Sequence, residues 1–393
     1  MNLTIKNAFL VDRDTAEPGT LHIVNGKIAK EGAPDATVID AEGKILMPAF
    51  VDPHVHFRTP GLEYKEDITT GSAAAAAGGY TAVCLMANTN PVCSSMEVVN
   101  LVKKLAAEVG KVDVHQCVSV TQNFDGKTID HLKELDDTIV CISEDGKGVQ
   151  SNHVMNQAML IAKERGMTVL SHTEDMEISP YDYRLAENIA TARDIFLSAY
   201  TGCPLHLCHV STKEAMDIII ENKQKGAPIT CEVGPHHIYF AGTGYRVNPP
   251  IRQQEDVDRL ITAIADGWVD CIATDHAPHT DEDKKNGSPG MVGLETAFSV
   301  CNTVLVQKHG LNICKLSEMM SCNPAKLLKM NKGLLQEGFD GDVVLVDVGE
   351  QYTVDKNKLH SKSKNTPFDG HTLMGKVKMT VKGGKITYID EKE

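Results

Sequence analysis

Eight apolar, strand-like runs dominate the middle of the chain, between about residues 50 and 335. Successive runs end 23 to 41 residues apart, and helical-looking stretches lie between them. The eight runs end near His56, Met86, Val120, Ser143, His172, His209, Val233 and Thr274. Each interval has room for a strand, a helix and two loops. This regular alternation favours a (β/α)8 TIM-type barrel over an open, doubly wound sheet.

The two ends of the chain have a different pattern of polar and apolar residues. Short segments such as LTIKNAFLV and GDVVLVDV alternate polar and apolar residues, and Asn-Gly or Gly-Gly pairs separate such segments. Period-2 alternation with these turns predicts β-hairpins. The chain therefore divides into a strand–helix middle and two hairpin-rich ends.

Composition excludes some classes of protein. A net charge of -14 argues against a nucleic-acid surface, which would be basic. Several of the 11 cysteines, such as Cys84, Cys141 and Cys271, lie in apolar runs and are expected to be buried thiols in a reducing compartment. The Ala-rich stretch at residues 72–87 is interrupted by Gly78 and Gly79, so it predicts a helix, a turn and a strand rather than a membrane span. We expect a cytoplasmic protein that binds neither nucleic acid nor membrane.

His54 and His56 end the first run, in the segment VDPHVHFR. Residues i and i+2 of a strand point to the same face, and barrel active sites lie at the carboxyl ends of the strands. A bare His-x-His match is weak evidence in a chain with 16 histidines. A metal-binding role for this pair is therefore supported only if the other strand ends also place potential metal ligands at the same rim.

Polar side chains follow four other runs, each within two residues of the strand end. Four imidazoles and two carboxylates at one rim predict a divalent-metal site, since imidazole suits zinc and carboxylates can bridge. The residues that join the first pair are Asp145, His172, His209 and Asp275. Any single histidine could instead be a hydrogen-bonded packing residue, but their shared placement at strand ends favours the metal site.

Four further histidines give weaker signals. His236 and His237 follow another strand, and both a supporting role at the site and simple packing stay open. His131 and His153 lie in polar, helical-looking stretches and are expected at the surface.

Seven motifs occur in order along nearly the whole chain: VDPHVHFRTPG, CLMANTNP, SEDGKGVQ, LCHVSTKEA, VNPPIR, ATDHAPHT and GMVGLETAF. Together they resemble the amidohydrolase superfamily and, more narrowly, its type I bacterial dihydroorotases. The resemblance implies a metal-bearing barrel over residues 50–339. It also implies a small β-sandwich formed by residues 1–49 and 340–393, in agreement with the hairpin texture of both ends.

The resemblance also implies roles for individual residues. Asp145 matches the aspartate that bridges two metals where related hydrolases use a carboxylated lysine. Asp275 would be both a ligand and the catalytic acid/base. The implied zinc ligands are His54, His56, Asp145, His172, His209 and Asp275. The implied substrate-binding residues are His56, Arg58, Asn88, Asn248, His279, Pro289 and Gly290.

Some of these assignments have alternatives. Glu144 could replace Asp145 in the bridge, with the other carboxylate solvated, and Lys147 could be carboxylated. Arg58 could be a surface ion-pair residue. Asn88 could brace its own NTNP turn, because Asn favours such turns.

The implied activity is that of a dihydroorotase. It would hydrolyse (S)-dihydroorotate reversibly to N-carbamoyl-L-aspartate, a step of pyrimidine biosynthesis toward UMP. Two zinc ions would bridge a hydroxide, and Asp275 would shuttle the proton. The polar stretch TDEDKKNGSPG would be a mobile lid. A homo-oligomer is expected, and association with aspartate transcarbamoylase is a further candidate.

Two other functions stay open at this point. The first is another cyclic amide hydrolase: a hydantoinase, a dihydropyrimidinase or an allantoinase. The second is a catalytically inactive assembly partner of aspartate transcarbamoylase. Retention of all six candidate ligands favours an active enzyme.

Overall fold

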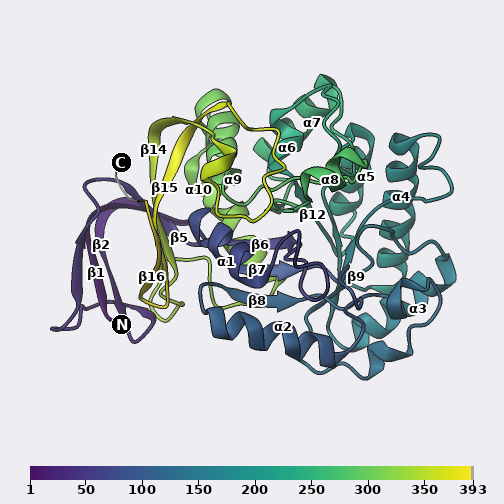
Figure 1. Ribbon diagram of the computed structural model, residues 1–393, viewed down its shortest axis with the longest axis horizontal. Helices are drawn as coiled ribbons and strands as arrows, with labels where there is room; N and C mark the ends of the chain where they lie inside the picture. Colours follow the sequence, from purple (N-terminus) through teal and green to yellow (C-terminus); the bar gives the residue numbers. More distant parts are fainter. Residues whose placement is uncertain (391–393) are drawn as a thin grey trace.

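The computed structural model describes residues 1–390, and its central feature is a barrel of eight parallel strands (Figure 1). Strands β6 to β8 form one sheet and β9 to β13 a second. Parallel bridges from Val118 to Ile142 and from Val55 to His276 join the two sheets. The strands are β6 Phe50–Val55, β7 Tyr80–Leu85, β8 Asp113–Gln116, β9 Cys141–Ser143, β10 Thr168–Ser171, β11 Leu205–Leu207, β12 Ile229–Val233 and β13 Cys271–Ile272. The predicted barrel is confirmed.

Seven of the eight strands end within two residues of the predicted place, and β8 is the exception. It ends at Gln116 rather than near Val120. The side-chain amide of Gln116 donates hydrogen bonds to the carbonyls of Leu85 and Cys117, at 3.1 and 2.8 Å. These bonds occupy carbonyls at the strand end, and the ladder resumes only as a single bridge at Val118.

Helices surround the barrel strands (Figure 1). Their bounds are α1 Ile68–Ala77, α2 Met96–Val109, α3 Asn152–Glu164, α4 Tyr183–Thr201, α5 Lys213–Gln224, α6 Pro235–Tyr239, α7 Gln254–Ala265, α8 Asp281–Lys285, α9 Ala297–Cys301, α10 Ile313–Ser317 and α11 Asn323–Leu327. None of the helices within residues 1–390 combines the length and the apolar character that a membrane crossing requires.

The Ala-rich stretch folds as predicted, into helix α1, a turn and strand β7. Asp67 caps α1 by accepting a hydrogen bond from the backbone N–H of Thr70. The turn contains Gly79 at φ +90°, and a Cβ there would meet the ring of Phe50 at 2.9 Å. Only glycine fits this close approach of the turn to the first barrel strand.

Strands from both chain ends form one eight-stranded sheet, drawn at the left of Figure 1. Its order is β16-β15-β14-β5-β1-β2-β3, with β4 beside β1. The strands are β1 Leu3–Val11, β2 Ala16–Val24, β3 Lys27–Ala29, β4 Thr37–Asp40, β5 Ile45–Pro48, β14 Val343–Thr353, β15 Thr372–Lys382 and β16 Lys385–Ile389. The predicted fold class, a barrel with a β-sandwich from both termini, is confirmed. The domain boundaries at residues 49 and 340 stay a prediction.

The terminal sheet has a core of its own. Strand β5 joins the two chain ends, because it pairs with β1 on one side and with β14 on the other. Side chains from both ends then pack into one apolar cluster that includes Leu3, Ile23, Leu46, Val343 and Met379. The two ends of the chain depend on each other for this core.

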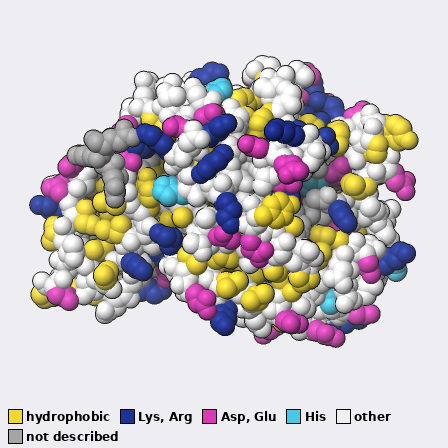
Figure 2. All heavy atoms as spheres, in the orientation of Figure 1, with side chains coloured by type: hydrophobic (Ala, Val, Ile, Leu, Met, Phe, Trp, Pro, Cys, Tyr) yellow, Lys and Arg dark blue, Asp and Glu magenta, His cyan; other side chains and the backbone are white. Residues whose placement is uncertain are grey.

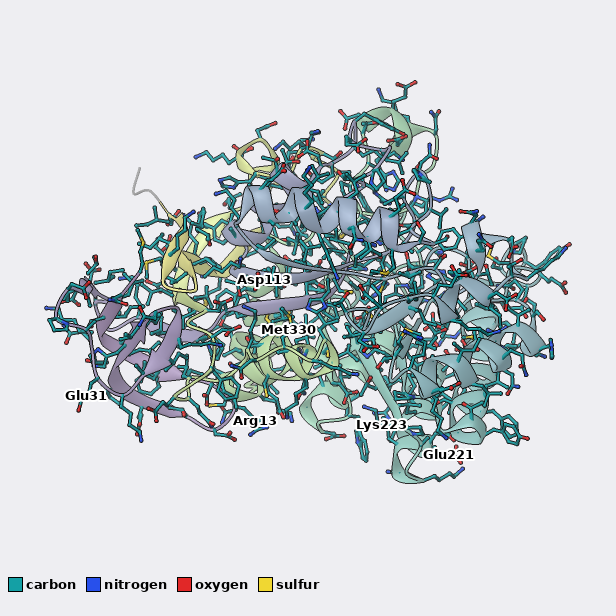
Figure 3. All side chains as sticks on the ribbon, turned by 90° about the horizontal axis from the view of Figure 1, so that it is seen from below. Arg13, Glu31, Asp113, Glu221, Lys223 and Met330 are labelled. Carbon is teal, nitrogen blue, oxygen red and sulfur yellow. The ribbon has the colours of Figure 1, made fainter. Side chains whose placement is uncertain are left out.

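Ion pairs connect the barrel to the terminal strands. Asp113 of β8 lies at this junction in Figure 3, and it accepts from Lys332 and from Lys382 of β15, both at 2.9 Å. Lys332 is buried and also pairs with Asp342, just before β14. Burial opposes the charge of Lys332, but Asp342 and Asp113 raise its pKa above the usual value. The amine therefore stays charged inside the junction.

The charged surface and the burial of the cysteines agree with what the sequence composition predicts. On the face drawn in Figure 2, Lys and Arg side chains are interspersed with Asp and Glu. Cys84, Cys141 and Cys271 are buried, as predicted.

Candidate metal centre

The predicted ligands converge on the carboxylate of Asp145. Its Oδ1 atom lies 3.3 Å from Nε2 of His54, 3.4 Å from Nδ1 of His172 and 3.7 Å from Nε2 of His209. Its Oδ2 atom lies 3.6 Å from Nε2 of His56. All five side chains are buried. Four barrel strands thus bring residues up to 155 positions apart to one point.

Two groups of potential ligand atoms share this carboxylate. The first consists of His54, His56 and Asp145, and the second of Asp145, His172 and His209. Asp275 lies beside the first group, with Oδ1 3.0 Å from Nε2 of His56 and 3.6 Å from Nε2 of His54. A carboxylate between two imidazole pairs can bridge two cations.

The donor set fits a divalent metal. Nε2 of His54 is buried and has no hydrogen-bond partner among the described residues, although it points at Asp145. Burial opposes the charge of Asp145 and Asp275, but the nearby imidazoles hold the pKa of both carboxyls below the usual range. Both therefore carry the negative charge that a bound cation requires.

The backbone at the site is strained in two of the predicted ligands and in one neighbouring residue. His209, Asp275 and Arg58 have φ angles of 37°, 47° and 62°, in the left-handed region that favours glycine. Such strain costs on the order of 1–3 kcal/mol per residue and concentrates at functional sites. It aims each side chain from just beyond its strand into the mouth of the barrel.

Glu232 of β12 contacts the predicted ligands His54 and His209, and the sequence did not predict this role. Its Oε1 atom lies 2.7 Å from Nδ1 of His54 and accepts from the backbone N–H of His209 at 3.2 Å, while Oε2 lies 3.0 Å from Nε2 of His206. Burial opposes its charge, but His54 and His206 lower its pKa to about 2. Its signal in the sequence is a carboxylate within the apolar run ITCEV.

Glu174 was also missed, and it supports His172. Its Oε2 atom lies 2.8 Å from Nε2 of His172 and accepts from Nδ2 of Asn248 at 2.9 Å. Burial would lower the pKa of His172, but Asp145 and Glu174 raise it to about 9. Such carboxylate–imidazole contacts fix the orientation of a metal-binding ring. The sequence feature that could have predicted this contact is the i, i+2 spacing of His172 and Glu174 in SHTED.

A cavity of about 210 Å³ opens above the ligands. It contains every predicted substrate-binding residue: His56, Arg58, Asn88, Asn248, His279, Pro289 and Gly290. The structure brings these residues together, and their individual roles stay predictions. Asp145, His172 and Asp275 line the cavity too, so ligands and candidate substrate contacts share one space.

Arg58 supplies a positive charge to this cavity. Its side chain is buried, and it donates to the Pro278 carbonyl and contacts Nε2 of His279, both at 3.3 Å. Burial lowers the pKa of Arg58 to about 10, so it stays protonated at neutral pH. Burial and the charge of Arg58 lower the pKa of His279 to about 3. Within residues 1–390, no carboxylate forms an ion pair with Arg58.

Some expectations for neighbouring residues are corrected. Glu144 is not solvated: it is buried, its Oε2 accepts from the backbone N–H of Thr121 at 2.8 Å, and burial raises its pKa. Lys147 is exposed and lies 5.7 Å from the ring centroid of Phe124, away from the ligands. The structure thus places Asp145, rather than either neighbour, among the imidazoles.

The four other histidines discussed from the sequence differ in their burial. His131 was expected at the surface but is buried, because Nε2 bonds the Ser119 carbonyl at 2.9 Å. His153 is exposed, as expected. His236 and His237 are buried, and His237 contacts the Pro249 carbonyl at 3.1 Å, next to Asn248. His237 therefore braces the loop that carries Asn248.

Comparison with known proteins agrees with this geometry. The model of the amidohydrolase family matches residues 45–387. The chain belongs to the amidohydrolase family. It is 52% identical to a dihydroorotase from Clostridium botulinum (strain Eklund 17B / Type B), across 99% of this chain and 100% of that protein.

Two solved structures have the same architecture as this chain. An L-hydantoinase (dihydropyrimidinase) from Arthrobacter aurescens superimposes with a TM-score of 0.89 at 27% identity, covering 98% of this chain and 95% of that one. A D-hydantoinase (dihydropyrimidinase) from Thermus sp. gives 0.88 at 26% identity, covering 99% and 97%. This amidohydrolase therefore shares its fold, over nearly the whole chain, with both hydantoinases.

Proposed function

We propose that this amidohydrolase is a metal-dependent dihydroorotase, which hydrolyses (S)-dihydroorotate reversibly to N-carbamoyl-L-aspartate in pyrimidine biosynthesis. Dihydroorotases are among its relatives, one of them 52% identical over the full length. The two hydantoinases named above are 27% and 26% identical. Substrate choice must therefore come from the site itself.

The observation that carries the proposal is the buried Arg58 guanidinium. A buried charge is costly unless a counter-charge compensates it. Asp275, Asp145 and Asp283 stabilise the charge of Arg58, but no carboxylate of the described residues lies within ion-pair distance of its guanidinium, which is left free to bind an anion in the cavity. Dihydroorotate carries a carboxylate at neutral pH, whereas hydantoin and dihydrouracil rings carry none. The planar fork of Arg58 can donate two parallel hydrogen bonds to such a carboxylate.

We propose further that the metals are two zinc ions. One would be held by His54 and His56, the other by His172 and His209, and Asp145 would be shared. When bound, such ions lower the pKa of water toward about 7 and polarise the carbonyl that is attacked. The buried, unpartnered Nε2 of His54 supports this ligand set.

Asp275 would move the proton. Its carboxylate lines the cavity beside His56, so it can meet both the attacking water and the ring nitrogen of a bound substrate. The low pKa of Asp275 keeps it ionised before the reaction. In hydrolysis the carboxylate accepts a proton from water and returns it to the leaving nitrogen, and ring closure reverses these steps.

Arg58, Asn88 and His279 would hold the substrate carboxylate. The neutral His279 ring can donate one hydrogen bond without adding a second cation beside Arg58. Helix α8 keeps the far wall in place, because Nζ of Lys284 donates to the Gly290 carbonyl at 2.8 Å. Opening of this segment as a lid, and association with aspartate transcarbamoylase, stay predictions.

The proposal is tested by turnover on a substrate panel with metal content measured on the same sample. We expect activity on dihydroorotate and N-carbamoyl-L-aspartate, loss of activity on metal removal, and recovery with zinc. Hydantoin, dihydrouracil and allantoin should be poor substrates. Preference for any of these neutral rings would assign the chain to the other cyclic amide hydrolases, and metal-bound protein inert on the whole panel would identify an inactive homologue.

A further inference from the structure

The ring of His279 lies between two cationic side chains. Its Nε2 atom lies 3.3 Å from Nη2 of Arg58, and its Nδ1 atom lies 3.3 Å from Nζ of Lys65. The histidine is buried, and burial together with the charges of Arg58 and Lys65 lowers its pKa to about 3. The ring is therefore uncharged at neutral pH and carries a single N–H.

The hydrogen-bonding groups around this ring do not match one another. A neutral imidazole has one nitrogen that donates and one that accepts, whereas an ammonium and a guanidinium can only donate. The ring can therefore accept from Lys65 or from Arg58, but not from both. On the other side its own N–H faces a cationic donor, and that side is satisfied only when an acceptor binds both donors.

The two sides of the ring differ in their access to such an acceptor. Arg58 and His279 both line the cavity above the metal centre, and Lys65 is not among the lining residues. An anion in the cavity can therefore accept from Nε2–H and from Arg58 together. On the Nδ1 side, the side chain of Lys65 is 12% exposed, and Nδ1 is the hydrogen-bond acceptor that residues 1–390 provide to its amine.

Asp283 is the group that could favour the opposite arrangement. Its Oδ2 atom lies 3.9 Å from Nδ1 of His279, which is beyond hydrogen-bond distance, and 3.6 Å from Nζ of Lys65. The same oxygen accepts from the backbone N–H and the hydroxyl of Thr280, at 3.1 and 2.9 Å. Asp283 therefore pairs with the ammonium and leaves Nδ1 to accept from Lys65.

The backbone of Lys65 is held in place on both sides of its side chain. Its N–H donates to the Leu62 carbonyl at 3.0 Å, and its carbonyl accepts from Oγ of Ser363 at 2.6 Å. The next residue, Glu66, is buried and accepts from the hydroxyl of Ser361. The ammonium thus approaches His279 from a segment that is bonded to the rest of the protein at several points.

We propose that Lys65 is a positioning residue for substrate recognition. By donating to Nδ1 it keeps the single proton of His279 on Nε2, where this N–H and Arg58 together bind the substrate carboxylate. The inference rests on the proposed function, because dihydroorotate supplies that carboxylate. The opposite tautomer would accept from Arg58 at Nε2 and would remove one donor from the anion site.

The same arrangement selects cyclic amides that carry a carboxylate. A neutral ring leaves Nε2–H of His279 and the guanidinium of Arg58 facing each other as two donors, and an unsatisfied buried donor costs free energy. A site built to bond one group rejects the analogue that lacks it, because the buried polar groups of the site are then unpaired. Lys65 would thus contribute to specificity without touching the substrate.

The position of the ring proton tests the proposal directly. In the full-length, metal-loaded protein with ¹⁵N-labelled histidine, protonated and unprotonated ring nitrogens give well-separated resonances, and the His279→Ala variant identifies the pair from His279. We expect the proton on Nε2 in wild type. In Lys65→Met, Arg58 is the remaining cationic donor at hydrogen-bond distance from the ring, so the proton should move to Nδ1. This measurement requires no turnover.

Kinetics test the consequence for binding. Loss of one hydrogen bond to a charged group should raise the KM of Lys65→Met for dihydroorotate by about tenfold or more and leave kcat within about threefold of wild type. Lys362→Met is the matched control, because Lys362 bonds Asp67 and the Glu63 carbonyl in the same segment rather than His279. Its KM should equal that of wild type. Thermal unfolding and metal content verify that each variant is folded.

A double-mutant cycle separates a role through His279 from the charge of Lys65 alone. In the His279→Ala background, Lys65→Met should change KM by less than about twofold, because the ring through which the ammonium acts is gone. The proposal is overturned by a proton on Nδ1 in wild type, by a proton that stays on Nε2 in Lys65→Met, by an unchanged KM in that variant, or by additive effects in the cycle. Preference of the wild type for neutral rings would instead refute the proposed function, and the position of the ring proton would still decide the role of Lys65.

Discussion

Glu232 Oε1 lies 2.7 Å from Nδ1 of His54, and the two residues are 178 positions apart in the chain. The contact fixes the His54 ring so that Nε2 faces Asp145. Glu232 also contacts His206 and accepts a hydrogen bond from the backbone of His209. One buried carboxylate therefore helps to orient two of the predicted ligands, His54 and His209.

Replacement of Glu232 by Gln should weaken metal binding. The amide keeps the shape but loses the charge that orients His54, and loss of such a partner typically lowers metal affinity about 10–100-fold. Metal retained after dialysis against graded chelator measures the effect. Asp256→Asn is the control, since Asp256 is equally buried but bonds Arg184 on the outside of the barrel. Equal retention in both variants would contradict the role of Glu232.

Asp275→Asn should be nearly inactive in both reaction directions. Removal of a general acid–base typically costs about 10²–10⁴-fold in rate, and added zinc cannot restore a proton carrier. Turnover of dihydroorotate and N-carbamoyl-L-aspartate at saturating zinc, with metal content measured on the same sample, checks this. Recovery to within a few-fold of wild type would reduce Asp275 to a ligand and leave His279 as the next candidate.

Arg58→Ala should lose most turnover of dihydroorotate and keep its metals. Arg58 lines the cavity and contacts His279, but it is outside both groups of potential ligands. Arg58→Lys should recover little, because an ammonium cannot form the two parallel bonds of a guanidinium. Kinetics and metal analysis are compared for the three proteins. Near-normal turnover of the Ala variant would return the substrate assignment to neutral rings.

Lys332→Met should destabilise the protein without changing the cavity. The change leaves Asp342 buried without its cation, and breaking a buried pair in this way costs about 3–5 kcal/mol. Chemical unfolding measures the loss. Lys104→Met, at an exposed position of α2, is the control and should change the free energy of unfolding by less than about 0.5 kcal/mol. A similar stability for both variants would show that the junction tolerates the unpaired carboxylate.

Local patterns were sufficient to predict the barrel and the placement of its chemistry. Strand and helix periods are properties of neighbouring residues, and a residue just beyond an apolar run lies at a strand end in any parallel barrel. His54, His56, His172, His209 and Asp275 could be found for this reason. The cavity then contains every residue that the motifs implied for substrate binding.

Local patterns could not choose between adjacent polar residues. Glu144 and Asp145 are neighbours in the sequence, yet Asp145 meets the imidazoles and Glu144 bonds Thr121. His131 lies in a polar stretch but becomes buried because its ring reaches the Ser119 carbonyl. These outcomes depend on which side of the backbone each loop presents, and residues far along the chain decide that.

The sequence by itself determined the order of strands and helices and the strand ends that carry imidazoles and carboxylates. The tertiary structure alone decided that Glu232 holds His54, that Glu174 holds His172, and that Arg58 is buried without an ion-pair partner in the described chain. The physical reason is the sequence separation of the contacts involved. Strand and helix patterns arise from contacts a few residues apart, whereas the neighbours of a buried charge are set by closure of the barrel, which brings the first and last strands together.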